Sequence, residues 1–384
     1  MGLILNDLKN ACELEHVCDY VNNRTTSSMN YISTENMLPN KGGISESTII
    51  PPGTTIEYKI GDILISNIRP YFQKIWCADR CGGCSADVLC IRAKENTDSK
   101  YLYYLLSQQA FFDYVMSGAK GCKMPRGDKK QIMQWPVNIP AIDVQKKVVA
   151  ILSSLDNKIR LNRRINDNLE EQAKALFKSW FVDNQDNDWK KIRLEEILEI
   201  GKTSIIPAQS PDTIFEHYSL PAFDNGTRPA YEKGCAIKSS KFYIQKNMFL
   251  FSKLNPRIKR IWFPNIQTEK AICSTEFIPY KPKDASLLGF CYSIVNSEAF
   301  YEYVLSLTNG STGSHQRFHP TATLDYSLKI PDKDIIKKFE SIVRPLYELI
   351  AKNRTENEKL ASLRDTLLPK LMSGKLSVEE VSFD

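Results

Sequence analysis

The chain has 384 residues, of which 42% are hydrophobic and 25% charged, so it has room for two or three domains with their own cores. The formal net charge of +6 permits a polyanionic partner without proving one. The start lacks the layout of a signal peptide, and the longest strongly apolar run, 287–295, is too short to cross a bilayer. With ten cysteines at irregular spacing, which suggest reduced thiols, we expect a soluble cytoplasmic protein.

The first part of the chain predicts a globular domain over residues 1–142. The segment IEYKIGDILISNI (56–68) predicts strands, with Gly61-Asp62 as a turn. Residues 99–117 predict one amphipathic helix with Ser99 at its N-cap. A glycine-rich basic loop follows at 118–130, and then a short proline-flanked strand, WPVNIP.

A long helix is predicted over residues 143–181, which contain no proline and no glycine. Apolar side chains recur at heptad spacing, and Asn162 interrupts them; the line consists of Val148, Leu155, Asn162, Leu169 and Leu176. A helix of this length spans roughly 57 Å and needs a partner along its apolar stripe.

The partner helix lies further along the same chain, because the pattern repeats. An offset of 191 residues gives the second line, Phe339, Leu346, Asn353, Leu360 and Leu367. Other segments repeat at slightly smaller offsets: 61–76 with 247–262, 85–93 with 274–282, and 110–117 with 299–306. An internal duplication explains all of these pairs.

The predicted fold class is therefore α/β (α+β): two globular domains, each followed by a long helix, with a pseudo-two-fold repeat. The predicted boundaries are a first domain at 1–142, a helix at 143–181, a linker at 182–190, a second domain at 191–333 and a second helix at 334–376. We expect the helices to pair as an antiparallel coiled coil. Asn162 and Asn353 lie near the helix midpoints, so we predict that they face each other or nearly so and fix the register of the pair.

Basic and polar residues gather at matching places in the two copies. Arginine, lysine, glutamine and serine bind phosphates or base edges, and glycines allow a backbone to approach them closely. The predicted DNA-binding residues are Arg69, Lys74, Lys120, Lys123, Arg126 and Lys129 in the first copy, and Lys253, Arg257, Lys259, Arg260, Ser314, Gln316 and Arg317 in the second. The alternative is that these loops are merely solvated.

No catalytic or metal-binding residue is predicted. Cys77, Cys81 and Cys84, with Cys90 nearby, have spacing that could hold an iron–sulfur cluster or zinc, but the second copy keeps only Cys273. The chain lacks a GxxxxGK[ST] phosphate loop, a dinucleotide motif, the Asn/Asp-Pro-Pro-aromatic element of amino-methyltransferases and a PD…(D/E)xK nuclease motif. Its four histidines form no evident catalytic set. The sequence favours a protein that binds.

The chain resembles the specificity (S) subunit of type I restriction–modification systems. The resemblance rests on the repeat layout and on three segments: KMPRGDKKQIMQWPVNIP (123–140) leading into the first long helix, SNIRPYFQKIW (66–76) and LRDTLLPKLMSGKL (363–376). The second copy departs from the pattern in its loop, where RFHPT replaces KMPRGD.

The resemblance implies a non-catalytic subunit that recognises double-stranded DNA and has no cofactor of its own. Each globular domain would be a target-recognition domain for half of a split site, and the helices would set the distance between the halves. Two modification subunits, which use S-adenosylmethionine, would methylate adenines. Restriction subunits, which use ATP and magnesium, would supply the motor and nuclease. Two alternatives remain: a DNA methyltransferase or nuclease in its own right, and a coiled-coil scaffold that binds only protein.

Overall fold

The computed structural model describes residues 11–26, 29–47, 53–308 and 316–381. The chain forms two compact units, one made of 1–156 with 362–384 and the other of 157–361. The unit boundary does not follow the predicted domain limits, because it cuts both long helices. Each unit therefore contains one globular part and a section of each helix.

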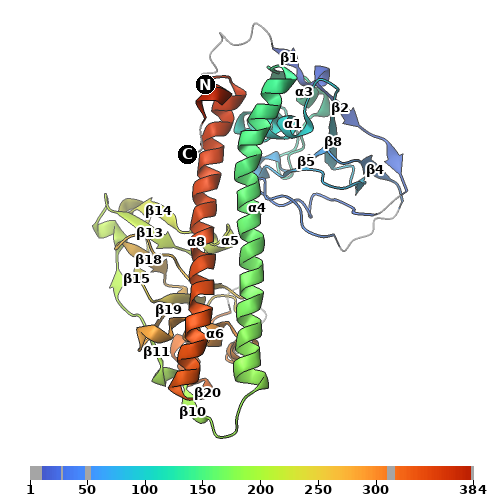
Figure 1. Cartoon of the computed structure of the whole chain (residues 1–384). Helices are drawn as coiled ribbons and strands as arrows, with labels where there is room; N and C mark the ends of the chain where they lie inside the picture. The colour runs from blue at the N-terminus through green and yellow to red at the C-terminus, as the bar shows by residue number, and fades with distance from the viewer. Residues whose placement is uncertain (1–10, 27–28, 48–52, 309–315, 382–384) are drawn as a thin grey trace. The chain divides into compact units, whose positions relative to one another are not determined.

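The two long helices are α4 (Ile142–Lys178, 37 residues) and α8 (Lys333–Met372, 40 residues), which run side by side (Figure 1). α4 continues into a π-helical turn, Ser179–Asp183, and α8 ends four residues before the predicted position 376. In the second unit the helices are antiparallel, because Asn162 contacts Asn357 and Asn166 contacts Asn353, and in the first unit Asp156 contacts Arg364.

The first globular part contains two main sheets and a two-stranded ribbon. The four-stranded sheet has the order β2 (Cys18–Val21), β8 (Val88–Ala93), β5 (Ile63–Ser66), β6 (Ile75–Cys77). The three-stranded sheet has the order β3 (Arg24–Thr25), β4 (Thr55–Tyr58), β7 (Gly82–Cys84), and the ribbon pairs β1 (Cys12–Glu13) with β9 (Pro136–Val137). The predicted turn at Gly61-Asp62 is present, with Gly61 at a φ of 88°, but it links two different sheets and not a hairpin.

The second globular part repeats this topology, which confirms the duplication. Its four-stranded sheet has the order β11 (Leu198–Ile200), β19 (Phe277–Pro282), β16 (Phe249–Ser252), β17 (Ile261–Trp262). Its second sheet has the order β12 (Ser204–Ile205), β15 (Lys241–Tyr243), β18 (Ala271–Ser274), β13 (Ile214–Tyr218), β14 (Ala230–Lys233). The ribbon pairs β10 (Lys190–Arg193) with β20 (Ser327–Ile330).

The two copies differ at the edge of the second sheet. β13 and β14 extend this sheet in the second copy, where β13 runs parallel to β18 and Tyr218 pairs with Cys273. In the first copy a single parallel bridge between Ile32 and Cys84 takes the corresponding place. The offset of 189 residues maps Cys84 onto Cys273, so the bridge is a shorter form of the same pairing.

Helices complete each globular part. The first has α1 (Ser99–Leu106), α2 (Gln109–Ser117) and α3 (Lys129–Met133), and the second has α5 (Leu220–Asp224), α6 (Leu288–Asn296) and α7 (Glu298–Ser306). The prediction of one helix over 99–117 is wrong, because Gln108 has extended backbone angles and separates α1 from α2. The N-cap is Asp98 and not Ser99, since the Asp98 carboxylate accepts bonds from the amides of Lys100 and Tyr101.

A buried polar side chain on each long helix holds the globular part of its unit. Gln145 on α4 is fully buried; its amide accepts a bond from the Asp98 backbone and donates to two carbonyls. Glu340 on α8 accepts the backbone N–H groups of Gly289 and Phe290, at 2.9 and 2.7 Å, at the start of α6. A carboxylate at a helix N-terminus satisfies donors that have no partner within the helix. The N-terminal section of each long helix is thus part of the core of the unit that contains it.

Asn162 and Asn353 are both buried between the helices, as predicted, but they do not bond to each other, because each bonds one helical turn away. Asn162 donates to Asn357 at 3.0 Å, and Asn353 donates to Asn166 at 2.9 Å. The 191-residue offset maps Asn166 onto Asn357, so the two bonds are equivalent when the helices are exchanged. Each helix carries asparagines four residues apart, and this spacing moves the pairing by one turn.

The described part of the C-terminal segment contacts the first unit. Val378–Glu380 form a 3-10 helix, and Glu379 contacts Lys147 on α4 at 3.0 Å. Val378 and Val381 also pack against the core of the first unit. Within the described ranges, none of the helices is long and apolar enough to cross a membrane.

Candidate nucleic-acid interface

In the first copy, the loop after β5 is joined to the basic loop at 118–130. Arg69 has a left-handed backbone with a φ of 51°, and its N–H donates to the Pro125 carbonyl at 2.9 Å. Next to it, Ile68 forms an antiparallel bridge with Arg126. A left-handed conformation costs a non-glycine residue about 1–2 kcal/mol. The bonds to the basic loop hold Arg69 in this conformation, so two segments far apart in sequence form one surface.

The second copy has the same joint built from different residues. Asn255, with a φ of 48°, donates its N–H to the Gln316 carbonyl at 2.9 Å, and Leu254 forms an antiparallel bridge with Arg317. Asn255 corresponds to Arg69 at the offset of 186, and Arg317 corresponds to Arg126 at the offset of 191. The structure therefore brings together the loop residues and strand-turn residues that the sequence suggested.

Two acidic residues complete the joint, and the sequence analysis missed both. The Asp87 carbonyl accepts the Asn67 N–H at 2.9 Å, and the Glu276 carbonyl accepts the Lys253 N–H at 2.9 Å. Their carboxylates contact the predicted arginines: Asp87 lies 3.1 Å from Arg126 Nη2. The matched segments 85–93 and 274–282 contain the available signal, a serine followed two residues later by an acid in both copies.

The acid–arginine pair is tighter in the second copy. Arg317 donates from Nε and from Nη2 to the two Glu276 oxygens, both at 3.0 Å, which is a bidentate arrangement. The hydrogen bond with Glu276 raises the pKa of Arg317 above its ordinary value. The Arg317 side chain stays 48% exposed and that of Arg126 57%, so both guanidinium groups face solvent while paired.

Three further predicted cations make no ion pair with any residue in the described ranges. Lys123 and Arg257 are exposed, and Lys253 is half-buried. Arg257 follows Pro256 in the loop between β16 and β17, and Lys123 lies in the basic loop of the first copy. An exposed cation without an acidic neighbour is available to bind a phosphate.

Other predicted cations are engaged within the fold. The ammonium group of Lys74 donates to the Thr34 carbonyl at 2.7 Å, and that of Lys259 to the Asn296 carbonyl at 2.7 Å. Burial lowers the pKa of both lysines. Arg260 forms a bidentate pair with Asp224 at 2.7 and 2.9 Å, and only 10% of its side chain is exposed. These three side chains stabilise the loops more directly than they offer charge to a ligand.

The remaining candidates have mixed surroundings. Lys120 contacts Asp128 at 3.1 Å, and this bond lowers the pKa of Asp128. Lys129 donates to the Tyr20 hydroxyl at 2.6 Å and lies over its ring. The Nε of Arg69 is buried without a hydrogen-bond partner among the described residues. Ser314 lies outside the described residues.

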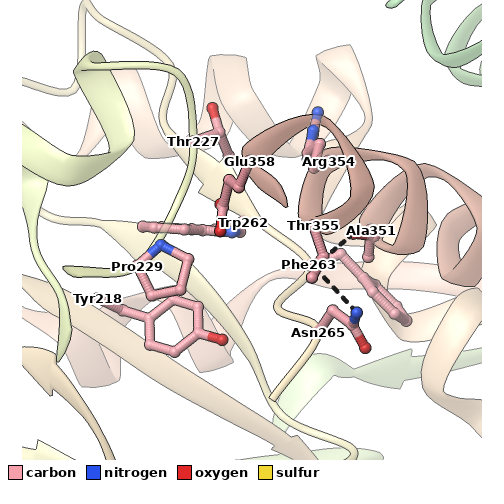
Figure 2. Close-up of a pocket in the computed structure, with 10 residues that line it drawn as sticks. All are labelled: Tyr218, Thr227, Pro229, Trp262, Phe263, Asn265, Ala351, Arg354, Thr355 and Glu358. Atoms are coloured by element: carbon pink, nitrogen blue, oxygen red, sulfur yellow. Dashed lines mark hydrogen bonds between the residues drawn. The ribbon is translucent and has the colours of Figure 1, made fainter. Parts of the chain in front are cut away.

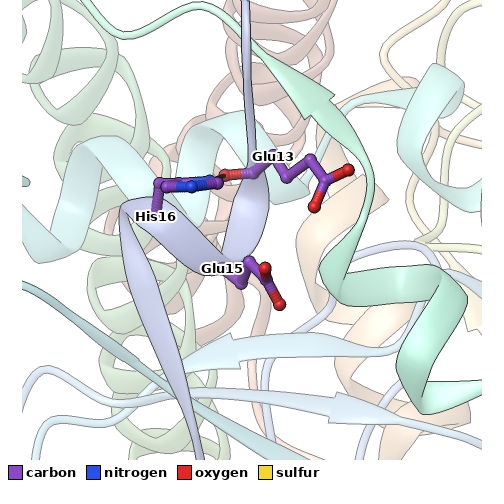
Figure 3. Close-up of side chains that lie close together, drawn as sticks. All are labelled: Glu13, Glu15 and His16. Carbon is purple, nitrogen blue, oxygen red and sulfur yellow. Dashed lines mark hydrogen bonds between the residues drawn. The ribbon is translucent and has the colours of Figure 1, made fainter.

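Neither a small cavity nor a group of possible metal ligands provides a second site. The cavity in Figure 2, beside Trp262 and Glu358, has a volume of about 10 Å³, room for about one water molecule. In the described part of the chain, one group of possible ligands lies together, Glu13, Glu15 and His16, and all three are exposed (Figure 3). Exposed side chains of this kind gather on many proteins without binding a metal.

The four cysteines between residues 77 and 90 were not predicted to bind a metal. Their four thiols do not lie close together in the structure. Among the described residues, Cys77, Cys81, Cys84 and Cys90 do not form a group of three with ligand atoms close together. Cys84 and Cys90 are buried, whereas Cys81 is exposed. Burial raises the pKa of Cys84 to about 12 and that of Cys77 to about 11, which disfavours the thiolates that bind metals.

Comparisons with known proteins agree with this architecture. Residues 10–171 match the family model of the type I restriction modification DNA specificity domain. The type I restriction enzyme MjaIX specificity subunit of Methanocaldococcus jannaschii is 26% identical, over 75% of this chain and 71% of its own length. The type I restriction enzyme HindI specificity subunit of Haemophilus influenzae is 23% identical, over 90% of this chain and 94% of its own.

A solved structure shows the same fold. It is the S subunit of a type I restriction-modification system from M. genitalium, with a TM-score of 0.58 and 15% identity, covering 97% of this chain and 98% of that one. The duplicated α/β domains, each completed by sections of the two long helices, define the class of protein by its fold. The chain is similar to type I restriction–modification specificity subunits along most of its length, and the family model matches its first globular part and most of its first long helix.

Proposed function

We propose that this chain is the DNA-recognition subunit of a type I restriction–modification complex and reads a bipartite site. Each globular part supplies one reading surface, formed by the loop after β5 with residues 118–130 in the first copy and by the loop after β16 with residues 316–317 in the second. The observation that carries the proposal is the repeated joint at these loops, with arginine exposed at the same position in both copies.

The two surfaces differ in the side chains that could contact bases. The first has Lys123 and Arg126 in a glycine-containing loop, and the second has Gln316 and Arg317, with Arg257 in the loop after β16. Different side chains on the same frame suit two different half-sites, because base edges in the major groove are distinguished by their hydrogen-bond donors and acceptors. Cations without acidic partners would supply the attraction to phosphates, which does not depend on sequence.

The proposal assigns the chemistry to partner subunits. The chain itself would hold no cofactor and catalyse no step. Two modification subunits that bind S-adenosylmethionine would methylate adenines in the site, and restriction subunits that use ATP and magnesium would cleave DNA. The similarity to these relatives supports this division, because they are named as specificity subunits of restriction enzymes.

The test is to express the chain with its partner methyltransferase and to map methylated adenines across a genome. We expect a motif of two defined halves separated by an undefined spacer. A continuous motif, or methylation that does not depend on this chain, would contradict the proposal. Methyl transfer by the isolated chain would support instead a methyltransferase in its own right.

Separate reading by the two halves gives a sharper prediction. Replacing Lys123 and Arg126 with alanine should relax recognition of one half-site and leave the base preference at the other unchanged. Both residues are exposed and belong to the first unit, so the change should leave the frame of the second unit intact. The measurement is the methylation motif of the variant, compared with that of Arg317→Ala. If either variant loses discrimination at both halves while it stays folded, the two surfaces do not read independently.

A further inference from the structure

We propose that Asp87 and Glu276 are positioning residues that orient Arg126 and Arg317 for reading a base pair in each half-site. The inference rests on the proposed function and deepens it, because it separates the cations that determine sequence preference from those that supply general affinity. Its basis is a set of contacts that both copies share although their loops differ in sequence.

The backbone of each acid is fixed from two sides. In the first copy, the Ser85 hydroxyl accepts the Asp87 N–H at 3.2 Å, and the Asp87 carbonyl accepts the Asn67 N–H at 2.9 Å. In the second copy, the Ser274 hydroxyl accepts the Glu276 N–H at 3.3 Å, and the Glu276 carbonyl accepts the Lys253 N–H at 2.9 Å. The acid is therefore held at a defined place beside the loop after β5 or β16.

The arginine is fixed in the same way. The backbone of Arg126 pairs with Ile68 and with Lys120, and the backbone of Arg317 pairs with Leu254. With both backbones anchored, the carboxylate restrains the remaining torsions of the arginine side chain. Residues that recognise a ligand lose less free energy on binding when their conformation is already restrained.

The chemistry of the pair leaves donors for a base. A guanidinium group has five N–H donors. In Arg317 the contact with Glu276 uses Nε and one Nη2 donor, so the outer edge formed by Nη1 and Nη2 stays available. Two parallel donors of this kind match O6 and N7 of guanine. In Arg126 the carboxylate contacts Nη2, which leaves Nε and Nη1 available.

Structural stabilisation is a weaker explanation of these pairs. Exposed ion pairs contribute little to folding, and both of these arginines are about half exposed. A carboxylate at a surface that binds DNA also repels phosphates, so its presence there opposes general affinity. A residue that lowers affinity and adds little stability, yet is present in both copies, is explained by a role in specificity.

The test uses the full chain in complex with its modification subunits, the wild-type methylation motif having been mapped first. Methylation rates are measured on duplexes that each change one base pair of the site, for wild type, Asp87→Asn, Asp87→Ala and Glu276→Gln. We expect each variant to lose about 10-fold or more of its discrimination at one base pair of one half-site. Binding to unrelated DNA should be equal or tighter, and the melting temperature unchanged.

Asp224→Asn provides the matched control, because Asp224 forms a bidentate pair with an arginine that is 90% buried. This variant should lower the melting temperature and leave discrimination at every base pair unchanged. The inference is overturned if the Asp87 and Glu276 variants keep full discrimination. It is also overturned if they lose activity equally on all duplexes together with a lower melting temperature. Absence of a bipartite motif in the wild type would refute the proposed function itself, which separates the two failures.

Discussion

Glu358, on the face of α8 that borders the small cavity in the second unit, has an unusual environment for a carboxylate (Figure 2). Burial is the main cause that raises its pKa to about 7; nearby Glu216 raises it further, and Arg228 opposes the shift. Glu216 is itself fully buried and accepts bonds from Tyr218 and from the backbone of residues 267–268. Ionising Glu358 therefore places a second negative charge near a carboxylate that is already held in place.

This environment predicts how stability depends on pH. A carboxyl group whose pKa is raised on folding binds its proton more tightly in the folded state, so stability is lost as pH rises from about 4.5 to about 7. Glu358→Gln, which is neutral at every pH, should raise the melting temperature relative to wild type at pH 8 and change it little at pH 4.5. Glu302→Gln, at an exposed position of α7, is the control. An equal effect of Glu358→Gln at both pH values would contradict the shift.

Cysteine reactivity gives a second prediction for single residues. Burial raises the pKa of Cys18 and Cys84 to about 12, and it also raises those of Cys273 and Cys291. Because the thiolate is the reactive form, these cysteines should alkylate slowly at pH 8 in the folded protein. The exposed cysteines, Cys81, Cys122 and Cys235, should react first. Mass spectrometry after timed alkylation measures the order, and early modification of Cys84 would contradict the burial described for it.

At the level of residues, the sequence predicted the arginines of the candidate site but not their acidic partners. The local composition of the sequence is enough to identify basic residues in a glycine-containing loop, so Arg126 and Arg317 could be predicted as candidate site residues. Asp87 and Glu276 lie some forty residues before these arginines, and only strand pairing brings them together. The burial of a single cation could not be predicted from the sequence either. Arg260 belongs to the same basic segment as Arg257 and Lys259, but the fold pairs it with Asp224 and leaves little of it exposed.

Among the elements, the limits of the long helices were the easiest to predict from the sequence. The register in which the two helices pair could not be predicted. Heptad spacing indicates which face of a helix is buried, and α4 begins and ends close to the predicted limits. The duplication suggested that equivalent midpoints meet, but a shift of one turn keeps apolar residues on the same face. The asparagines decide between these registers. Asn162 donates to Asn357 and Asn353 donates to Asn166, so each of the four side chains takes part in a bond across the helix pair.

The asparagine bonds should be coupled energetically. Asn353→Leu alone leaves the buried Asn166 oxygen without its donor, which costs about 1–3 kcal/mol. Adding Asn166→Leu removes the unpaired group, so the double variant should cost less than the sum of the single ones, by about 0.5–3 kcal/mol. Denaturant unfolding of the four proteins measures the coupling. The corresponding cycle at Asn162 and Asn357 should show a smaller coupling, because Asn162 also donates to Glu356 and Asn357 is half-buried. Additive losses at Asn166 and Asn353 would mean that the bond does not fix the register.

For the whole molecule, the unit boundary identifies where the spacing between half-sites could be changed. It falls after Asp156 in α4 and after Ala361 in α8, and within the first unit Asp156 contacts Arg364, three residues beyond the break in α8. The contacts of Asp156 with Tyr104 and Arg364 belong to the first unit, and those of Asn162 with α8 to the second. Seven residues inserted at both points would therefore keep the packing of each unit, and a full heptad keeps the apolar stripe facing its partner.

If the helix pair measures the DNA, this insertion should change the spacer and nothing else. Seven residues lengthen each helix by roughly 10 Å, which corresponds to about 3 base pairs at 3.4 Å per step. The spacer in the methylation motif should grow by about 2–4 pairs, with both half-site sequences unchanged. Three pairs also rotate one half-site by roughly 100° about the DNA axis, so the level of methylation should fall. Mapping methylated adenines in cells that carry the variant measures both effects. The control is a heptad inserted into α4 alone: the Asp156–Arg364 contact and the asparagine pairs then cannot both form in one helix pair, so methylation should be abolished. A folded, active double insertion with unchanged spacing would show that the helices do not determine the distance between the half-sites.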